Sequence, residues 1–95
     1  MPELHFDVRW PDGAVERCYS PSRSVMDYLE AGASYPLADF VGRSRSALEL
    51  AGERVRLRYG FACSSAADQL DQIEARAAMF DSGSGARVTV MGFHE

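Results

Sequence analysis

The sequence predicts an α+β fold, in which a helical hairpin covers one face of a three-stranded sheet, in the order β-β-(short α)-α-α-β. Apolar and polar residues alternate near the start of the chain, two long segments repeat apolar residues at steps of three and four, and a short apolar run closes the chain. Alternation is typical of half-buried strands, and steps of three and four are typical of amphipathic helices. Strands at both ends with helices between them predict a sheet with helices on one side.

Residues 4–19 are predicted to form a β-hairpin. The segment Leu4–Trp10 places an apolar residue at every second position. Pro11–Gly13 has the chemistry of a turn, because proline presets φ, aspartate bonds the backbone and glycine accepts a positive φ. Ala14–Tyr19 then reads as the returning strand.

A short helical turn is predicted after the hairpin. Pro21 stops the second strand, since proline cannot continue a central ladder. Ser24–Asp27 begins a helical turn, which Gly32 ends.

The first long helix is predicted to include Pro36 in its first turn and to end at Gly60. Its outer surface interleaves arginines with glutamates, which indicates a solvated, salt-bridged face. Its apolar positions are Leu37, Phe40, Val41, Leu48, Ala51, Val55 and Tyr59.

The second helix is predicted to be capped by Ser64 or Ser65, with Asp68 completing a pattern like a capping box. The loop Asp81–Gly85 follows, and Arg87–Phe93 reads as the last strand. The inward positions of this helix are Ala66, Leu70, Ile73, Ala77 and Phe80.

Composition limits the class of protein. We expect the 95 residues, 1–95, to make a single domain. The net charge of −4 argues against a general nucleic-acid binder. No apolar run is long enough to span a bilayer and the first residues do not resemble a signal peptide, so we expect a cytoplasmic protein that does not bind membranes.

The cysteines and histidines give no support for a metal site. Cys18 and Cys63 have no C-x-x-C spacing, and His5 and His94 lie near opposite ends of the chain. We therefore expect neither a metal nor a cofactor.

The positions of the cysteines follow from an argument about topology. If the first long helix runs back along the sheet, the joint between the helices lies near the hairpin turn. Cys63 would then neighbour Trp10 and Asp12 and lie far from Cys18. The connection from Ser20 to Tyr35 is long enough to reverse this arrangement.

Cys63 is the candidate nucleophile, because it lies at the start of the second helix. A helix N-terminus stabilises a thiolate or a bound anion. The alternative is that Cys63 is a small apolar residue packed between two helix ends. The candidate residues for binding a ligand or partner are Trp10, Asp12, Tyr59, Phe61, Ser64, Ser65 and Asp68.

Several segments of the sequence resemble those of a family of small bacterial nitrogen-starvation-response proteins. They cover nearly the whole chain: Glu3–Phe6, Trp10–Gly13, Glu16–Ser22, Tyr35–Val41, Arg43–Arg45, Tyr59–Ala66 and Asp68–Leu70. The resemblance implies genes that lie beside one for a nitrilase-type hydrolase, in clusters linked to nitrogen scavenging and to nitrile or cyanide metabolism. It supplies no catalytic residues.

Two functions from different classes follow. The first is a small accessory protein that binds a partner enzyme of the same gene cluster, or a small metabolite. Its partner would meet the Trp10 end, the open face of the sheet carrying His5, Asp7 and Arg9, or the arginine-bearing helix. An uncovered sheet face and edge strand also favour a homodimer. The second is a thiol-dependent enzyme or carrier that uses Cys63.

Overall fold

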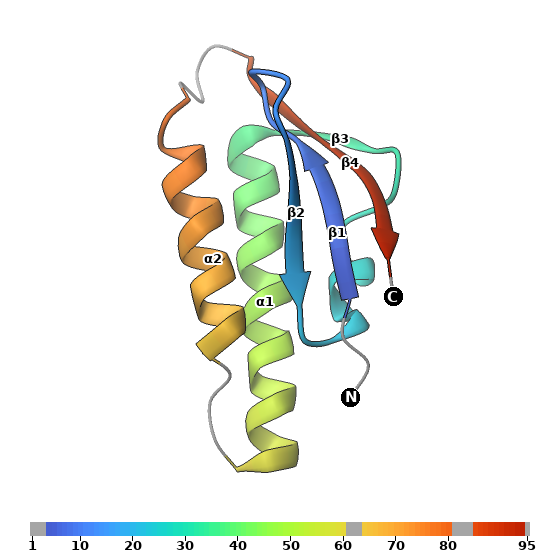
Figure 1. Ribbon diagram of the computed structural model, residues 1–95, viewed down its shortest axis with the longest axis vertical. Helices are drawn as coiled ribbons and strands as arrows, with labels where there is room; N and C mark the ends of the chain where they lie inside the picture. Colours follow the sequence, from blue (N-terminus) through green and yellow to red (C-terminus); the bar gives the residue numbers. More distant parts are fainter. Residues whose placement is uncertain (1–3, 61–63, 81–84, 95) are drawn as a thin grey trace.

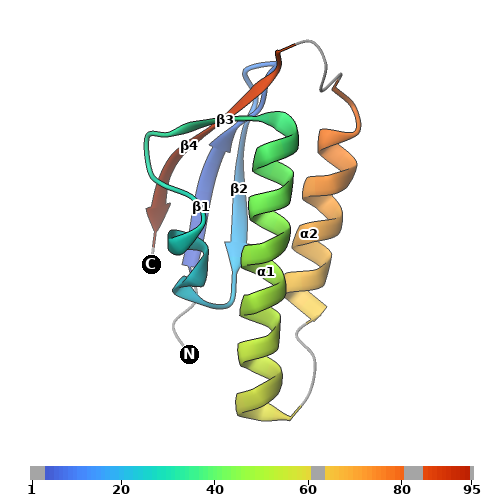
Figure 2. The same ribbon diagram turned by 180° about the vertical axis from the view of Figure 1, so that it is seen from behind.

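The structure, a computed structural model, describes residues 4–60, 64–80 and 85–94. It is an α+β fold in which two long helices cover one face of an antiparallel four-stranded sheet of order β2-β1-β4-β3 (Figure 1; Figure 2). The elements are β1 Leu4–Arg9, β2 Val15–Ser20, the 3-10 helix η1 Arg23–Asp27, β3 Ser34–Pro36, α1 Leu37–Tyr59, α2 Ser64–Ala77 and β4 Arg87–His94. The α+β class and the two long helices are confirmed, but the predicted count of three strands is wrong, and the short helix predicted as α is a 3-10 helix.

The additional strand is β3, at one edge of the sheet. Its three residues pair with β4 in the register Ser34↔Thr89, Tyr35↔Val88 and Pro36↔Arg87. Three residues are too few to show a period of two, and Pro36 is also compatible with a helix start. An edge strand tolerates proline because the side that lacks an N–H group can face away from the ladder.

The hairpin of β1 and β2 forms as predicted. The two strands pair from Leu4↔Ser20 to Arg9↔Val15. The turn between them has Gly13 at φ +88°, and the Asp12 side chain accepts a hydrogen bond from the Ala14 N–H at 3.0 Å. A left-handed glycine and an aspartate that caps its own turn are the features that the sequence predicts there.

Helix α1 ends at Gly60, as predicted. Gly60 adopts φ +80° and donates its N–H to the Arg56 carbonyl at 2.8 Å, which is a left-handed helix cap. The last turns of α1 extend beyond the sheet (Figure 1). Tyr59, expected on the apolar side, is therefore 49% exposed, and Leu57 is 72% exposed.

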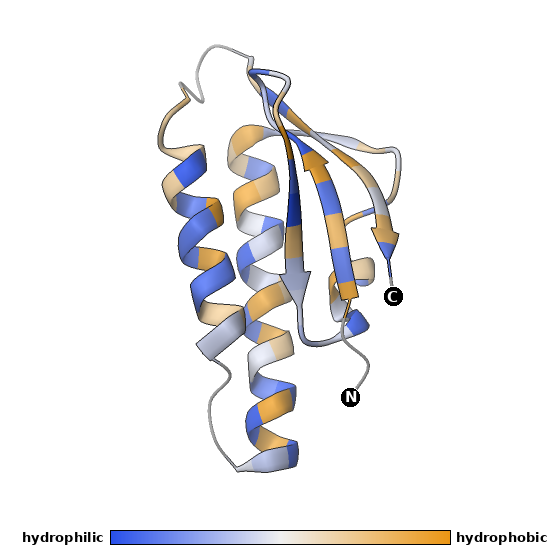
Figure 3. Cartoon of the chain, viewed as in Figure 1, coloured by the Kyte–Doolittle hydropathy of each residue, from blue (hydrophilic) through white to orange (hydrophobic). Residues whose placement is uncertain are grey.

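The core lies between the sheet and the helices. Along β1, residues alternate between hydrophobic and hydrophilic, and the hydrophobic Leu4, Phe6 and Val8 are fully buried (Figure 3). Trp10 continues this row: its ring meets Phe40 edge to face at 5.6 Å between centroids and stacks on Phe80 at 6.1 Å. The predicted alternation thus marks the side of the sheet that the helices cover.

The segment between β2 and β3 packs on the same side of the sheet as the long helices (Figure 2). Ser22 caps η1 by accepting a hydrogen bond from the Ser24 N–H, and Val25 and Leu29 are buried in the core. Within the described ranges, no helix is both long and apolar enough to cross a membrane.

Candidate functional site

The open face of the sheet carries a row of ionisable side chains. Side chains of successive strand residues point to opposite faces, so the register places His5, Asp7 and Arg9 of β1 away from the helices. Their partners across the strands on this face include Arg17 of β2 and His94 of β4. The expectation that His5, Asp7 and Arg9 line the open face is confirmed.

Asp7 is the centre of this face. Arg17 donates from Nε to Asp7 Oδ1 at 2.9 Å and from Nη2 to Oδ2 at 3.3 Å. His94 Nε2 lies 2.9 Å from the same Oδ2, and since an ionised carboxylate only accepts, His94 is the donor. The hydrogen bond from Arg17 is the main cause that lowers the pKa of Asp7 from its ordinary value.

The strand opposite Asp7 leaves room for this network. Asp7 faces Gly92 across the β1–β4 ladder, and a β-bulge between Asp7 and Val8 shifts the register. A Cβ built on Gly92 would meet no heavy atom within 4 Å. Bulges re-aim nearby side chains, and this one lies directly beside the aspartate.

The open face has a charge opposite to that of the whole chain. On the described part of this face, three arginines (Arg9, Arg17 and Arg87) against Asp7 leave two positive charges when the histidines are neutral, whereas the whole chain carries −4. Arg9 is exposed and forms no ion pair with any residue that the structure describes. The face therefore offers the Arg9 guanidinium, which has no acidic partner among the described residues, beside the ion-pair network of Asp7.

Two of the candidate residues, Trp10 and Asp12, lie at the hairpin turn and take part in structural contacts. Trp10 is 1% exposed and belongs to the core, so it closes the end of the core and offers no surface to a partner. Asp12 caps the turn and accepts a hydrogen bond from Arg76 Nη2 at 3.0 Å. Arg76 lies in the last turn of α2, so the hairpin turn meets the end of that helix.

The first half of α2 instead lies against the other end of β2. Ser65, Asp68, Gln69 and Gln72 of α2, with Tyr19 of β2, line a hollow of about 410 Å³. The Gln69 Oε1 accepts a hydrogen bond from the Tyr19 N–H at 2.8 Å. The structure thus brings together two predicted site residues, Ser65 and Asp68.

The expected position of the helix joint is therefore wrong. Ser65 lies near Tyr19, at the opposite end of the hairpin from Asp12 and its partner Arg76. The physical reason is β3, which returns the chain along the sheet so that α1 begins at the turn end. The long connection between β2 and α1 had left this alternative open.

The cysteine hypothesis keeps the status of a prediction, because Cys63 and Phe61 lie outside the described residues. Cys18 is the described cysteine, and it is fully buried on the helix side of β2. Burial, with the negative charges of Glu16 and Asp7, raises the pKa of its thiol to about 12. Cys18 is therefore a packing residue, because the reactive form of cysteine is the thiolate.

Tyr59 and Ser64 lie on either side of the helix joint. Tyr59 is exposed at the end of α1, and the guanidinium carbon of Arg58 lies 5.8 Å from its ring centroid. Ser64 begins α2 and is exposed. Neither residue lines the hollow beside Tyr19.

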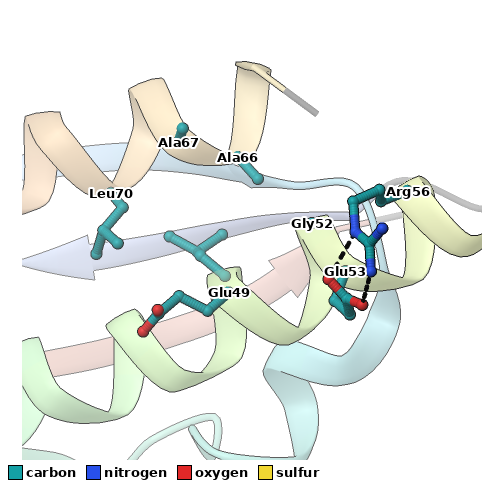
Figure 4. Close-up of a pocket in the computed structure, with 8 residues that line it drawn as sticks. Glu49, Gly52, Glu53, Arg56, Ala66, Ala67 and Leu70 are labelled. Carbon is teal, nitrogen blue, oxygen red and sulfur yellow. Dashed lines mark hydrogen bonds and ion pairs between the residues drawn. The ribbon is translucent and has the colours of Figure 1, made fainter. Parts of the chain in front are cut away.

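A second, more apolar hollow lies between α1 and α2 (Figure 4). It has a volume of about 220 Å³, and Gly52 faces Ala66 there, with 3.9 Å between a Cβ built on the glycine and the alanine Cβ. Arg56 Nε donates to Glu53 Oε2 at 3.0 Å at its rim, so these charges already satisfy each other. Small residues at a helix contact account for this hollow. It is lined by Leu48, Glu49, Gly52, Glu53, Arg56, Ala66, Ala67 and Leu70.

Comparison with protein families identifies the family of the chain. A family model described as nitrogen starvation-induced protein NitG matches residues 5–93. The chain belongs to this family. The match confirms the resemblance to a nitrogen-starvation family, and it covers both helices, the hollow and the open face apart from His94. No curated protein and no solved structure matches the chain.

Four residues of these surfaces were not among the predicted sites: Arg17, Tyr19, Gln69 and His94. His5 and His94 were set aside because they lie far apart in the sequence, yet they are cross-strand partners. Period-two alternation in the first and last strands could have placed both histidines on one face. No group of three or more metal-ligating side chains forms among the described residues.

Proposed function

We propose that this member of the NitG family is a small cytoplasmic accessory protein of a nitrogen-scavenging pathway. In this proposal it binds a partner enzyme of the nitrilase type through the open face of its sheet. The family match supports the link to nitrogen starvation. The open face supports the binding role, because no helix of the described residues covers this side of the sheet (Figure 1), and ionisable residues line it.

The network around Asp7 carries the proposal. Asp7, Arg17 and His94 hold one another at hydrogen-bond distance before any partner arrives. Side chains that are already fixed lose less conformational entropy on binding. Arg9, without an acidic partner among the described residues, is left to meet a carboxylate of the partner.

The two other surfaces considered for a partner are less favourable. Trp10 is buried and cannot anchor a partner. The arginines of α1 are largely committed to acids on the helices, as in the pairs Arg43–Asp39 and Arg45–Glu74. The open face combines an accessible guanidinium with fixed geometry.

The test is a calorimetric titration of the purified protein with the purified nitrilase-type hydrolase from the same organism. Arg9→Glu reverses the free charge without removing the Asp7 network, and we expect it to weaken binding about tenfold or more. Arg58→Glu makes the same change at the exposed end of α1 and is the matched control. Absence of a complex with the wild-type protein, or equal loss in both variants, would contradict the proposal.

A further inference from the structure

A row of polar side chains crosses three strands on the open face, at its end near the hairpin turn. Arg9 of β1 lies opposite Thr89 of β4, and Thr89 lies opposite Ser34 of β3. Directly opposed residues of antiparallel strands share a face and have Cβ atoms about 4.5–5.5 Å apart. Arg87 precedes Thr89 by two residues on β4, so its side chain projects from the same face. The strand pairing therefore places two arginines around the hydroxyl group of Thr89.

Neutral groups hold Arg87 in position. Its Nε donates to Ser34 Oγ at 2.9 Å, and its Nη2 donates to the Ser34 carbonyl at 2.8 Å. These bonds direct the guanidinium toward β3, on the side of Thr89 away from Arg9. A hydroxyl and a carbonyl orient the guanidinium without neutralising its charge. They also leave three of its five N–H donors without an acceptor among the described residues.

No acid of the described residues offsets the two arginines of this row. Arg9 and Arg87 form no ion pair there, and the acid on the described part of the face is Asp7. The Asp7 carboxylate is already engaged by Arg17 and His94. Two guanidinium groups on neighbouring strands repel each other, and an anion between them turns that repulsion into attraction.

The donors of this row suit an anion with more than one charge and more than two oxygens. Guanidinium groups bind phosphate and carboxylate oxygens in charge-assisted hydrogen bonds. A phosphate monoester carries nearly two negative charges at neutral pH and three acceptor oxygens, so each arginine and the hydroxyl can bind its own oxygen. A carboxylate has one charge and two oxygens and leaves one of the three donors unused.

We propose that Arg9, Thr89 and Arg87 form a binding site for a dianionic phosphate group of a small molecule. The proposal goes beyond partner binding by the open face and does not rest on it. Arg87 and Thr89 have no part in that proposed function, and a phosphate can bind whether or not a partner enzyme does.

The experiment is an NMR titration of the ¹⁵N-labelled full chain with methyl phosphate, at about pH 7.5 and constant ionic strength. Acetate is the singly charged probe. We expect saturable shifts of the Arg9 and Thr89 backbone amides in about the millimolar range, with acetate binding about tenfold more weakly. Equal affinity for the two probes, or no saturable shift of these amides, would overturn the proposal.

Inorganic phosphate, titrated in the same way, identifies the source of the phosphate group. It carries the same dianion without an ester. Tighter binding of methyl phosphate supports a phosphorylated metabolite, and tighter binding of inorganic phosphate supports the free ion. The titration contains no partner protein, so its failure and the failure of the proposed complex are separate results.

Single variants test the residues of the site. We expect Arg9→Gln and Arg87→Gln each to weaken binding of methyl phosphate about tenfold, and Thr89→Val to weaken it a few-fold. Arg58→Gln is the matched control, because Arg58 is an exposed arginine at the end of α1 with no acidic partner among the described residues. Full binding by Arg87→Gln, or an equal loss in Arg58→Gln, would refute the assignment. The dispersion of the same spectra reports whether each variant is folded.

Discussion

The two faces of the sheet differ in what holds their side chains in place. On the helix side of β1, every second residue is apolar and fully buried between the strands and the helices. On the open side, Asp7 is held by hydrogen bonds to an arginine and a histidine that are themselves half exposed. Packing of apolar area contributes far more to stability than exposed ion pairs do. The covered face therefore determines the fold, and the open face is available for recognition.

The largest expected effect is the loss of packing on the covered face. Trp10→Ala removes a ring that contacts Phe40 and Phe80, and we expect it to lower the free energy of unfolding by about 3–5 kcal/mol. Urea denaturation measures this change. His5→Ala, on the open face of β1, should change stability by only about 0.5 kcal/mol. Similar losses in the two variants would contradict the division between the faces.

The second prediction concerns the thiol of Cys18. With a pKa raised to about 12, the thiolate in the folded protein at pH 8 is about one molecule in ten thousand. Iodoacetamide should therefore modify Cys18 very slowly in the folded state and rapidly in denaturant. Site-resolved mass spectrometry measures both rates. Rapid modification of folded Cys18 at pH 8 would show that this side of β2 is not sealed from solvent.

The third prediction concerns Gly52, where the two helices meet. Gly52→Ala should raise the free energy of unfolding by about 0.5–1 kcal/mol, because alanine is the better helix former and its Cβ reaches ordinary contact with Ala66. Gly42→Ala is the matched control, since an added Cβ there meets no atom within 4 Å. It should stabilise through helix propensity alone. Thermal or urea unfolding compares the two, and destabilisation by Gly52→Ala would contradict the helix contact described.

The fourth prediction concerns the charged interactions of Asp7. Its pKa is lowered in the folded state, mainly by the hydrogen bond from Arg17, so the associated stability is present above the unfolded pKa and is lost as the pH falls through the folded pKa. Asp7→Asn should cost about 0.5–1 kcal/mol at neutral pH, and the difference from wild type should shrink below about pH 4.

Urea denaturation across this pH range tests the Asp7 prediction. Asp27→Asn is a suitable control because Asp27 is exposed on η1, away from the network. An effect of Asp7→Asn that persists unchanged at low pH would exclude the charged interaction as its cause.

Much of the architecture was predictable because it depends on local chemistry. The hairpin turn needs only a left-handed Gly13 and an Asp12 that bonds the next backbone N–H, and the cap of α1 needs only a left-handed Gly60. Strand β3 was missed because pairing with β4, rather than its own three residues, makes it a strand. The helix joint was misplaced for the same reason, since β3 sets the end of the sheet at which α1 begins.

The candidate sites show the same limit. Ser65 and Asp68 were predicted from a helix start. Gln69 was not, because its contact with β2 is a hydrogen bond from the Tyr19 N–H, fifty residues away. His94 was dismissed for its distance in sequence from His5, although antiparallel pairing makes the two neighbours. No local pattern encodes such pairs.

Local sequence patterns specify which residues form the core strands and the two long helices, where the hairpin turns and where α1 ends. These features follow from alternation, helical spacing and the backbone preferences of a few residues, all of which act within a few positions of the chain. Contacts between distant segments specify the fourth strand, the direction of the helices and the hydrogen-bond partners of Asp7 and Gln69. Those outcomes depend on strand pairing and packing between distant segments, where register and chain direction select the neighbours.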